Sequence, residues 1–228
     1  NSSGINNPDN YSTVRDIAIM SQYLIKNHPD YYELFKEKTF TWDRTGGDPI
    51  TQGNRNPLLY KRVGVDGIKT GYLALEKYSL ASTMKRDQRR LISVASGFQT
   101  KNLRSSGSLK ILSWGFRNTD TFEIAKKNKT IFPVKSWLGK KTEIDGVTKE
   151  DVFLTLKKKE ARNLKVFLKY DGPIKAPITK DQEIAKIEIF VKDNLIKKIP
   201  IYAAENINKV NVFKSLFMSL NYLIWGDA

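Results

Sequence analysis

Val65-Asp66-Gly67-Ile68-Lys69-Thr70-Gly71-Tyr72 is the stretch that decides the fold of the first half of this chain. It opens a series of three segments with strand character, separated by short polar turns, at residues 67–71, 78–85 and 90–96. A segment with helical spacing follows at residues 104–116. Antiparallel strands with flanking helices predict an α+β unit.

Two helices and a strand are expected before this stretch. Thr13-Val14-Arg15-Asp16 has the pattern of a capping box, and the apolar residues after it recur on one side of a helix. Asn27-His28-Pro29 should end this helix, and Pro29 suits the first turn of a second, shorter one. Residues 39–42 predict a strand, and residues 45–49 predict a loop.

Beyond Asn118 the helical pattern gives way to alternation with period two. Residues 164–170 and 186–189 alternate between apolar and polar side chains, and Asp171-Gly172 and Asp193-Asn194 supply turns. We therefore expect a first domain at residues 1–118 and a small all-β domain at residues 119–206.

The last segment, residues 208–225, returns to helical spacing. At 100° per residue its apolar side chains gather on one broad arc: Val210, Val212, Phe213, Leu216, Phe217, Leu220, Leu223 and Ile224. This arc either packs on the protein itself or lies on a membrane surface, where Tyr222 and Trp225 would suit the headgroup region. We favour the second interpretation and assign residues 207–228 to a membrane-associating amphipathic helix.

Charge and composition exclude several classes of function. The net charge of +15 is spread evenly, as +8 over residues 1–118 and +7 over residues 119–228, which disfavours a nucleic-acid stripe and suits an anionic membrane or envelope surface. The chain has no cysteine and a single histidine, His28. These residues offer neither a zinc-thiolate site nor a good Ser-His-Asp triad, and we expect no metal and no cofactor.

The tripeptide Lys69-Thr70-Gly71 is one of three elements of a known serine active site. The other two are a Ser-x-x-Lys turn and a Ser-x-Asn element, in enzymes that attack β-lactams or D-Ala-D-Ala peptides. Together with other blocks in the same order, it resembles the D-alanyl-D-alanine carboxypeptidases, which are low-molecular-mass penicillin-binding proteins. The other blocks are Tyr11-Ser12-Thr13-Val14-Arg15-Asp16, Asn54-Arg55-Asn56-Pro57-Leu58-Leu59-Tyr60, Arg90-Leu91-Ile92-Ser93-Val94, Leu112-Ser113-Trp114-Gly115-Phe116-Arg117, Pro133-Val134-Lys135-Ser136-Trp137-Leu138-Gly139 and Asp151-Val152-Phe153-Leu154-Thr155-Leu156.

The resemblance implies that residues 1–118 form part of a penicillin-binding, transpeptidase-like domain, with the nucleophile on a missing preceding segment or a companion chain. Two stretches fit the other motifs, Ser82-Thr83-Met84-Lys85 and Ser219-Leu220-Asn221. The first lies in a strand-like run, whereas a nucleophile needs a helix N-terminus that faces a cleft. The second lies on the C-terminal helix, so we expect neither to be catalytic.

The resemblance also implies roles for individual residues. Lys69 would organise proton transfer, and Thr70 would place its hydroxyl against the terminal carboxylate of the substrate. Gly71 would leave room for the peptide, and the backbone N–H of Tyr72 would be one of two oxyanion donors. Because a histidine often follows Lys-Thr-Gly in the family, Tyr72 should alter substrate preference more than mechanism.

A terminal carboxylate also needs a cation, and a bidentate arginine suits it better than a lysine. Arg104 matches the family position for this role, and Arg55 is a second candidate. The alternatives are a surface position for Arg104 and a structural ion pair for Arg55.

These observations predict a serine-type D-Ala-D-Ala carboxypeptidase that trims peptidoglycan stem peptides through an acyl-enzyme and is inhibited by β-lactams. We expect it on the periplasmic face of the cytoplasmic membrane, attached through residues 208–225. The alternative is a non-catalytic module that binds peptidoglycan or an envelope partner. A β-lactamase fits less well, because single-domain β-lactamases have no appended β domain.

Overall fold

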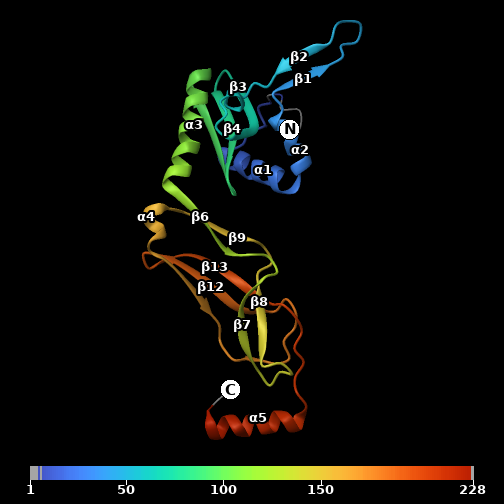
Figure 1. Ribbon diagram of the computed structural model, residues 1–228, viewed down its shortest axis with the longest axis vertical. Helices are drawn as coiled ribbons and strands as arrows, with labels where there is room; N and C mark the ends of the chain where they lie inside the picture. Colours follow the sequence, from blue (N-terminus) through green and yellow to red (C-terminus); the bar gives the residue numbers. More distant parts are fainter. Residues whose placement is uncertain (1–4, 6, 227–228) are drawn as a thin grey trace. The chain divides into compact units, whose positions relative to one another are not determined.

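The computed structural model describes residue 5 and residues 7–226 of the 228-residue chain. The chain divides into two compact units, Asn1–Asn118 and Thr119–Ala228, called unit 1 and unit 2 below. Unit 1 mixes helices with strands, whereas unit 2 consists mostly of strands (Figure 1). The predicted α+β fold class, with a C-terminal helix, is therefore confirmed.

Unit 1 is built around one small antiparallel sheet. Its helices are α1 (Val14–Asn27), α2 (Pro29–Glu33) and α3 (Lys101–Asn118), with 3-10 turns at Leu34–Lys36 and Pro57–Tyr60. Strands β3 (Val65–Leu73), β4 (Lys77–Arg86) and β5 (Arg89–Phe98) form the sheet in that order, so β3 lies at an edge. Strands β1 (Thr39–Trp42) and β2 (Ile50–Gly53) pair as a separate hairpin (Figure 1).

Helix α1 begins at the predicted capping box. The Thr13 hydroxyl accepts a hydrogen bond from the backbone N–H of Asp16 at 3.1 Å, and the Asp16 carboxylate accepts one from the backbone N–H of Thr13 at 2.9 Å. The bonds that the Asp16 carboxylate accepts from the backbone N–H and from the hydroxyl of Thr13 hold the pKa of Asp16 below its usual value. The helix ends at Asn27, just before Pro29.

The sheet of unit 1 packs on both faces, because neighbouring residues of a strand point to opposite sides. Leu80 and Met84 of β4 pack with Leu112 of α3 on one face. On the other face, Ala81 packs in a cluster that includes Ile17 of α1. The two helices therefore cover opposite faces of β4, and the edge strand β3 contacts β4 and the two 3-10 turns.

Unit 2 contains a six-stranded sheet and a two-stranded one. The six-stranded sheet has the order β10 (Leu164–Lys169), β12 (Glu183–Val191), β13 (Asn194–Ala203), β8 (Glu143–Val147), β7 (Thr130–Trp137) and β11 (Ile174–Lys175). The smaller sheet pairs β6 (Thr119–Ala125) with β9 (Val152–Lys157). Inward-facing aliphatic side chains such as Ile187, Ile189 and Ile201 form one continuous core.

Two sequence predictions need correction in unit 2. A short helix, α4 (Lys158–Ala161), interrupts the expected all-β domain, and its four residues are too few to leave a helical period in the sequence. The C-terminal helix α5 (Val212–Trp225) begins four residues later than predicted, with Asn211 as its N-cap. Residues 208–210 instead bond to the backbone of residues 138–140, which buries Val210.

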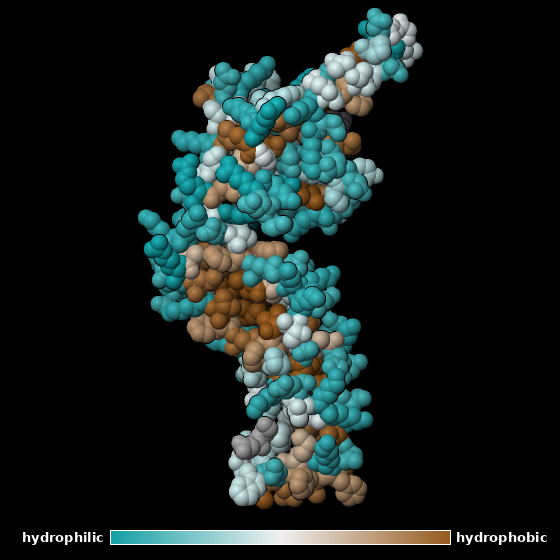
Figure 2. Space-filling model, in the orientation of Figure 1, coloured by the Kyte–Doolittle hydropathy of each residue, from teal (hydrophilic) through white to brown (hydrophobic). Residues whose placement is uncertain are grey.

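The apolar arc of α5 faces solvent and does not pack on the sheets of unit 2. Seven apolar side chains on this arc are at least half exposed: Val212, Phe213, Leu216, Phe217, Leu220, Leu223 and Ile224. The other side of the helix contacts β7, where the ring of Tyr222 lies 5.1 Å from that of Trp137. Figure 2 shows apolar side chains along α5. Among the described residues, no helix combines the length and hydropathy that crossing a bilayer requires.

Candidate active site

The Lys-Thr-Gly motif lies on β3, the edge strand of the unit 1 sheet. Lys69 and Tyr72 are exposed, while Thr70 and Gly71 are half-buried. The Lys69 ammonium donates a hydrogen bond to the backbone oxygen of Thr70 at 2.7 Å. An edge strand has unpaired backbone groups, so this arrangement can accept an extended peptide alongside β3.

Gly71 is crowded on one side by the strand next to it. A Cβ atom added at Gly71 would collide with the Ser79 hydroxyl of β4, so any larger residue requires Ser79 to rotate. The absence of a side chain therefore serves the pairing of β3 with β4, which sequence reasoning did not anticipate.

Arg104 is buried at the N-terminal end of α3, with 7% of its surface exposed, which excludes the surface alternative. Its guanidinium lies 5.6 Å from the centre of the Tyr78 ring, and that ring is 4.6 Å from the ring of Tyr72. Burial lowers the pKa of Arg104, and its Nε has no hydrogen-bond partner among the described protein atoms. The structure thus brings Arg104 to the end of the motif strand through two aromatic rings.

Arg55 is exposed in the loop that follows β2, and no ion pair to it occurs in the described part of the chain. The residues on either side fix this loop. Asn54 donates to the backbone oxygen of Glu37 at 2.9 Å, and Asn56 donates to the backbone oxygen of Gly67 at 3.0 Å. Arg55 is therefore held by a loop that is bonded directly to β3.

The Ser82-Thr83-Met84-Lys85 stretch lies within β4, as expected from its strand-like pattern. Ser82 and Thr83 are fully buried, so neither hydroxyl is accessible to a substrate. The Ser219-Leu220-Asn221 stretch lies on α5 in unit 2. Within residues 5 and 7–226, no cluster of three or more His, Asp or Glu side chains is arranged to hold a metal ion.

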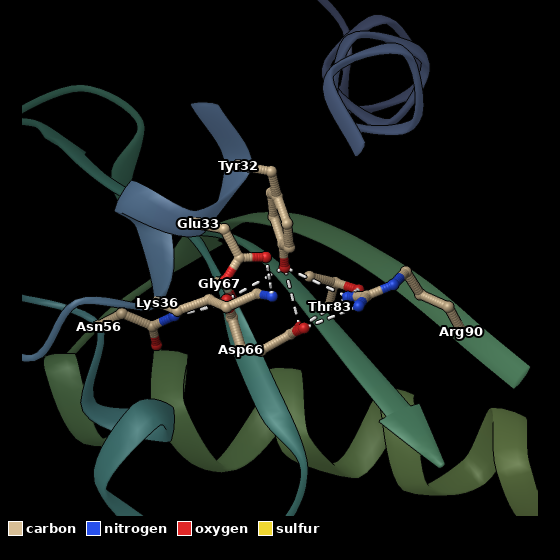
Figure 3. Close-up of polar contacts among 8 residues, drawn as sticks. All are labelled: Tyr32, Glu33, Lys36, Asn56, Asp66, Gly67, Thr83 and Arg90. Carbon is tan, nitrogen blue, oxygen red and sulfur yellow. Dashed lines mark hydrogen bonds and ion pairs between the residues drawn. The ribbon is translucent and has the colours of Figure 1, made fainter. Parts of the chain in front are cut away.

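A polar cluster that the sequence did not reveal lies at the start of β3 (Figure 3). Arg90 of β5 binds the Asp66 carboxylate through two bonds of 2.7 Å, and it also donates to Thr83 of β4 at 3.0 Å. The Tyr32 hydroxyl donates to the Asp66 carboxylate at 2.8 Å and to the Asp66 backbone oxygen at 3.1 Å. We call Tyr32, Asp66, Thr83 and Arg90 the Asp66 cluster.

Both Asp66 and Arg90 are partly buried, with 22% of each side chain exposed. The bonds to Asp66 raise the pKa of Arg90, and burial followed by the nearby Asp66 charge raises the pKa of Tyr32. The hydroxyl of Tyr32 therefore remains a proton donor at neutral pH. A charged residue inside an apolar strand sequence, as Asp66 is, was the one signal that could have pointed to this cluster.

Two family models match the chain. The model described as D-alanyl-D-alanine carboxypeptidase matches residues 1–100, and the model described as the C-terminal domain of penicillin-binding protein 5 matches residues 120–209. The D-alanyl-D-alanine carboxypeptidase DacD of Escherichia coli is 33% identical over 189 residues, which are 82% of this chain and 47% of that protein. DacA of Haemophilus influenzae is 35% identical over 187 residues, 81% of this chain and 46% of that protein. The chain thus spans about half the length of these relatives.

Solved structures give the same result. Penicillin-binding protein 5 from Haemophilus influenzae superimposes with a TM-score of 0.81 at 31% identity, covering 90% of this chain and 59% of that one. Penicillin-binding protein 6B from Escherichia coli superimposes with a TM-score of 0.60 at 29% identity, covering 86% of this chain and 51% of that one.

Proposed function

The chain belongs to the D-alanyl-D-alanine carboxypeptidase family, and from this membership we propose that it forms part of a serine-type D-Ala-D-Ala carboxypeptidase acting on peptidoglycan stem peptides. The observation that carries the proposal is the exposed Lys69 beside the half-buried Thr70 on the edge strand β3, with only the ring of Tyr78 between Arg104 and Tyr72. The nucleophilic serine is contributed by polypeptide outside this chain.

In this mechanism the serine attacks the carbonyl between two D-alanines, the peptide bond breaks and the terminal D-alanine leaves with a proton on its amine. Water then hydrolyses the acyl-enzyme and releases the shortened peptide. The substrate peptide lies along the free edge of β3, where Lys69 assists proton transfer and the backbone N–H of Tyr72 stabilises the oxyanion. Thr70 and the buried guanidinium of Arg104 bind the terminal carboxylate, with Arg55 as the second cation. β-Lactams inhibit by acylating the same serine.

A fluorescent penicillin tests this proposal. This chain alone should remain unlabelled, whereas a longer protein that carries a Ser-x-x-Lys segment ahead of residue 1 should label covalently. In that protein Lys69→Ala should slow labelling by about 100-fold or more. Lys110→Ala removes an exposed lysine of α3 and should leave the rate unchanged. A longer protein that stays unlabelled would leave the non-catalytic envelope-binding module as the better account.

We also propose that α5 attaches the protein to the periplasmic face of the cytoplasmic membrane. Its seven exposed apolar side chains support this, because the free energy falls when a solvent-exposed apolar arc moves from water into the headgroup boundary. The net charge of +15 adds attraction to anionic lipids.

Co-sedimentation with phosphatidylglycerol vesicles measures this attachment. Removal of residues 208–228 should release the protein into the supernatant. Phe217→Asp places a charge on the apolar arc and should weaken binding at least about tenfold. Asn221→Asp adds the same charge outside the arc and should have a much smaller effect. Equal sedimentation of the two variants would contradict attachment through the arc.

A further inference from the structure

The Asp66 cluster lies at an irregularity of β3, three residues before Lys69. Val65 pairs with Met84 and Gly67 pairs with Thr83, so two residues advance on β3 while one advances on β4. Asp66 is therefore the extra residue of a β-bulge. A bulge shifts the phase of every later residue in its strand, because side chains alternate between the two faces.

The bulge interrupts the hydrogen bonds of the strand ladder, and side chains replace them. The Asp66 backbone oxygen accepts from the Tyr32 hydroxyl at 3.1 Å, and the next oxygen, that of Gly67, accepts from Asn56 at 3.0 Å. The Asp66 side chain is held by Arg90 from β5, across the middle strand. The irregular backbone is thus bonded from α2 and from the loop before the Pro57–Tyr60 turn, while β5 holds the Asp66 side chain (Figure 3).

Gly67 makes the contact with Tyr32 close. A Cβ atom at Gly67 would lie 2.9 Å from the Tyr32 hydroxyl oxygen and 3.2 Å from its ring, closer than such atoms normally approach. The Tyr32 ring therefore rests directly on the β3 backbone, two residues before Lys69, and only glycine leaves room for it there.

We propose that the Asp66 cluster, together with Asn56, positions the catalytic motif by holding this bulge in one register; the inference rests on the proposed function. With the bulge in place, Lys69 and Thr70 occupy the faces that the proposed mechanism requires. Loss of the extra residue from the pairing would exchange their faces. The members of the cluster have no assigned contact with substrate, so they act through β3.

The chain itself allows a first test, by hydrogen–deuterium exchange of the amides of residues 68–73. Tyr32→Phe keeps the ring over Gly67 but removes the two hydroxyl bonds to Asp66 and the one accepted from Arg90, and exchange should become about fivefold faster. Tyr60→Phe is the matched control, because it likewise removes a tyrosine hydroxyl that bonds to the backbone, here to the oxygens of Lys38 and Asn54. It should leave the amide exchange rates of residues 68–73 unchanged. Equal exchange in the two variants would overturn the proposed restraint.

The second test measures acylation in the longer protein that carries the Ser-x-x-Lys segment. The amplitude of penicillin labelling reports the folded fraction, whereas the rate constant reports how well the motif is placed. Tyr32→Phe should lower the rate constant about fivefold to tenfold at unchanged amplitude, and Tyr60→Phe should change neither. A purely structural role would lower only the amplitude and would overturn the proposal.

Gly67→Ala provides an independent variant if Tyr32→Phe fails to fold. It keeps every bonding group of the cluster but pushes the Tyr32 ring away from β3. The rate constant should again fall by about tenfold with labelling amplitude retained. An unchanged rate constant would reject positioning by the cluster. Absence of labelling in the unsubstituted longer protein would instead reject the proposed function, and the exchange test would still decide whether the cluster restrains β3.

Discussion

The two units of this chain bury different kinds of atoms. Unit 2 has one continuous core of aliphatic side chains, whereas unit 1 has two smaller clusters on opposite faces of its sheet. Unit 1 also buries polar atoms without a hydrogen-bond partner among the described protein atoms, on Ser82, Ser93, Arg104, Ser105 and Ser108. Each such atom costs about 1–3 kcal/mol when nothing satisfies it.

This difference contrasts a unit with one continuous apolar core with a unit that also buries polar atoms lacking a partner among the described atoms. Local rules of good packing are broken most often at functional sites. In unit 1 the breaks lie on α3 and on the two strands that it covers, and they include the arginine proposed to bind substrate. The comparison predicts opposite responses to substitution at the buried aliphatic side chains of unit 2 and at the buried serines of unit 1.

The largest expected effect is in the core of unit 2. Ile189 is fully buried, so Ile189→Ala should lower the free energy of unfolding by about 2–5 kcal/mol. Ile196→Ala makes the same change on β13 at a side chain that is 50% exposed, and it should cost much less. Denaturant unfolding followed by hydrogen exchange of unit 2 peptides measures both. Similar costs would break the comparison.

A smaller effect is expected at the start of α1 in unit 1. Thr13→Ala removes the cap of the helix and should lower the free energy of unfolding by about 1 kcal/mol. Ser12→Ala is the neighbouring control, since among the described residues the Ser12 hydroxyl bonds only to the backbone oxygen of Thr13. Thermal unfolding should place the first variant below the second.

The charged centre of unit 2 should respond to pH. The Glu188 carboxylate accepts bonds from Lys169 at 2.8 Å and from Lys198 at 2.9 Å, and these bonds lower its pKa. Because the pKa of Glu188 is lower in the folded state, its ionised carboxylate stabilises the fold at pH values above its unfolded-state pKa of about 4.3. This stabilisation is lost as the pH falls through the folded-state pKa. The melting temperature of Glu188→Gln should therefore lie below that of the unsubstituted chain at pH 7, and the gap should close in acid. A constant gap would rule out this linkage.

The smallest effect should have the opposite sign. Ser108 of α3 is fully buried and its hydroxyl has no hydrogen-bond partner among the described atoms, so Ser108→Ala should leave stability unchanged or raise it by up to about 1 kcal/mol. Ser106→Ala, at an exposed position of the same helix, should change it by less than about 0.5 kcal/mol. A clear loss at Ser108 would mean that the hydroxyl has a partner and would weaken the contrast between the units.

Local patterns predicted the fold well. The capping box at Thr13 and the alternating segments that became β10 and β12 depend on neighbouring residues, so the sequence displays them directly. The late start of α5 could not be predicted, because residues 208–210 look helical and are diverted by bonds to residues 138–140. Long-range pairing overrides local pattern at such points.

The candidate site divides in the same way. The Lys69-Thr70-Gly71 motif on β3 is contiguous, so the sequence alone identifies it. The bond between Asp66 and Arg90 joins residues on different strands and leaves no local sequence pattern. Helix α3 turns Arg104 and Ser108 toward the sheet, although their polarity predicts a solvent-facing position. Only the three-dimensional structure reveals that these polar groups of α3 are buried.

The ring contact between Trp137 and Tyr222 gives unit 2 an internal optical gauge. Excitation energy passes efficiently from tyrosine to tryptophan over such a short separation. The tryptophan emission excited at tyrosine wavelengths should therefore decrease when α5 detaches from β7. A fluorimeter could then follow docking and release of the C-terminal segment without any attached dye.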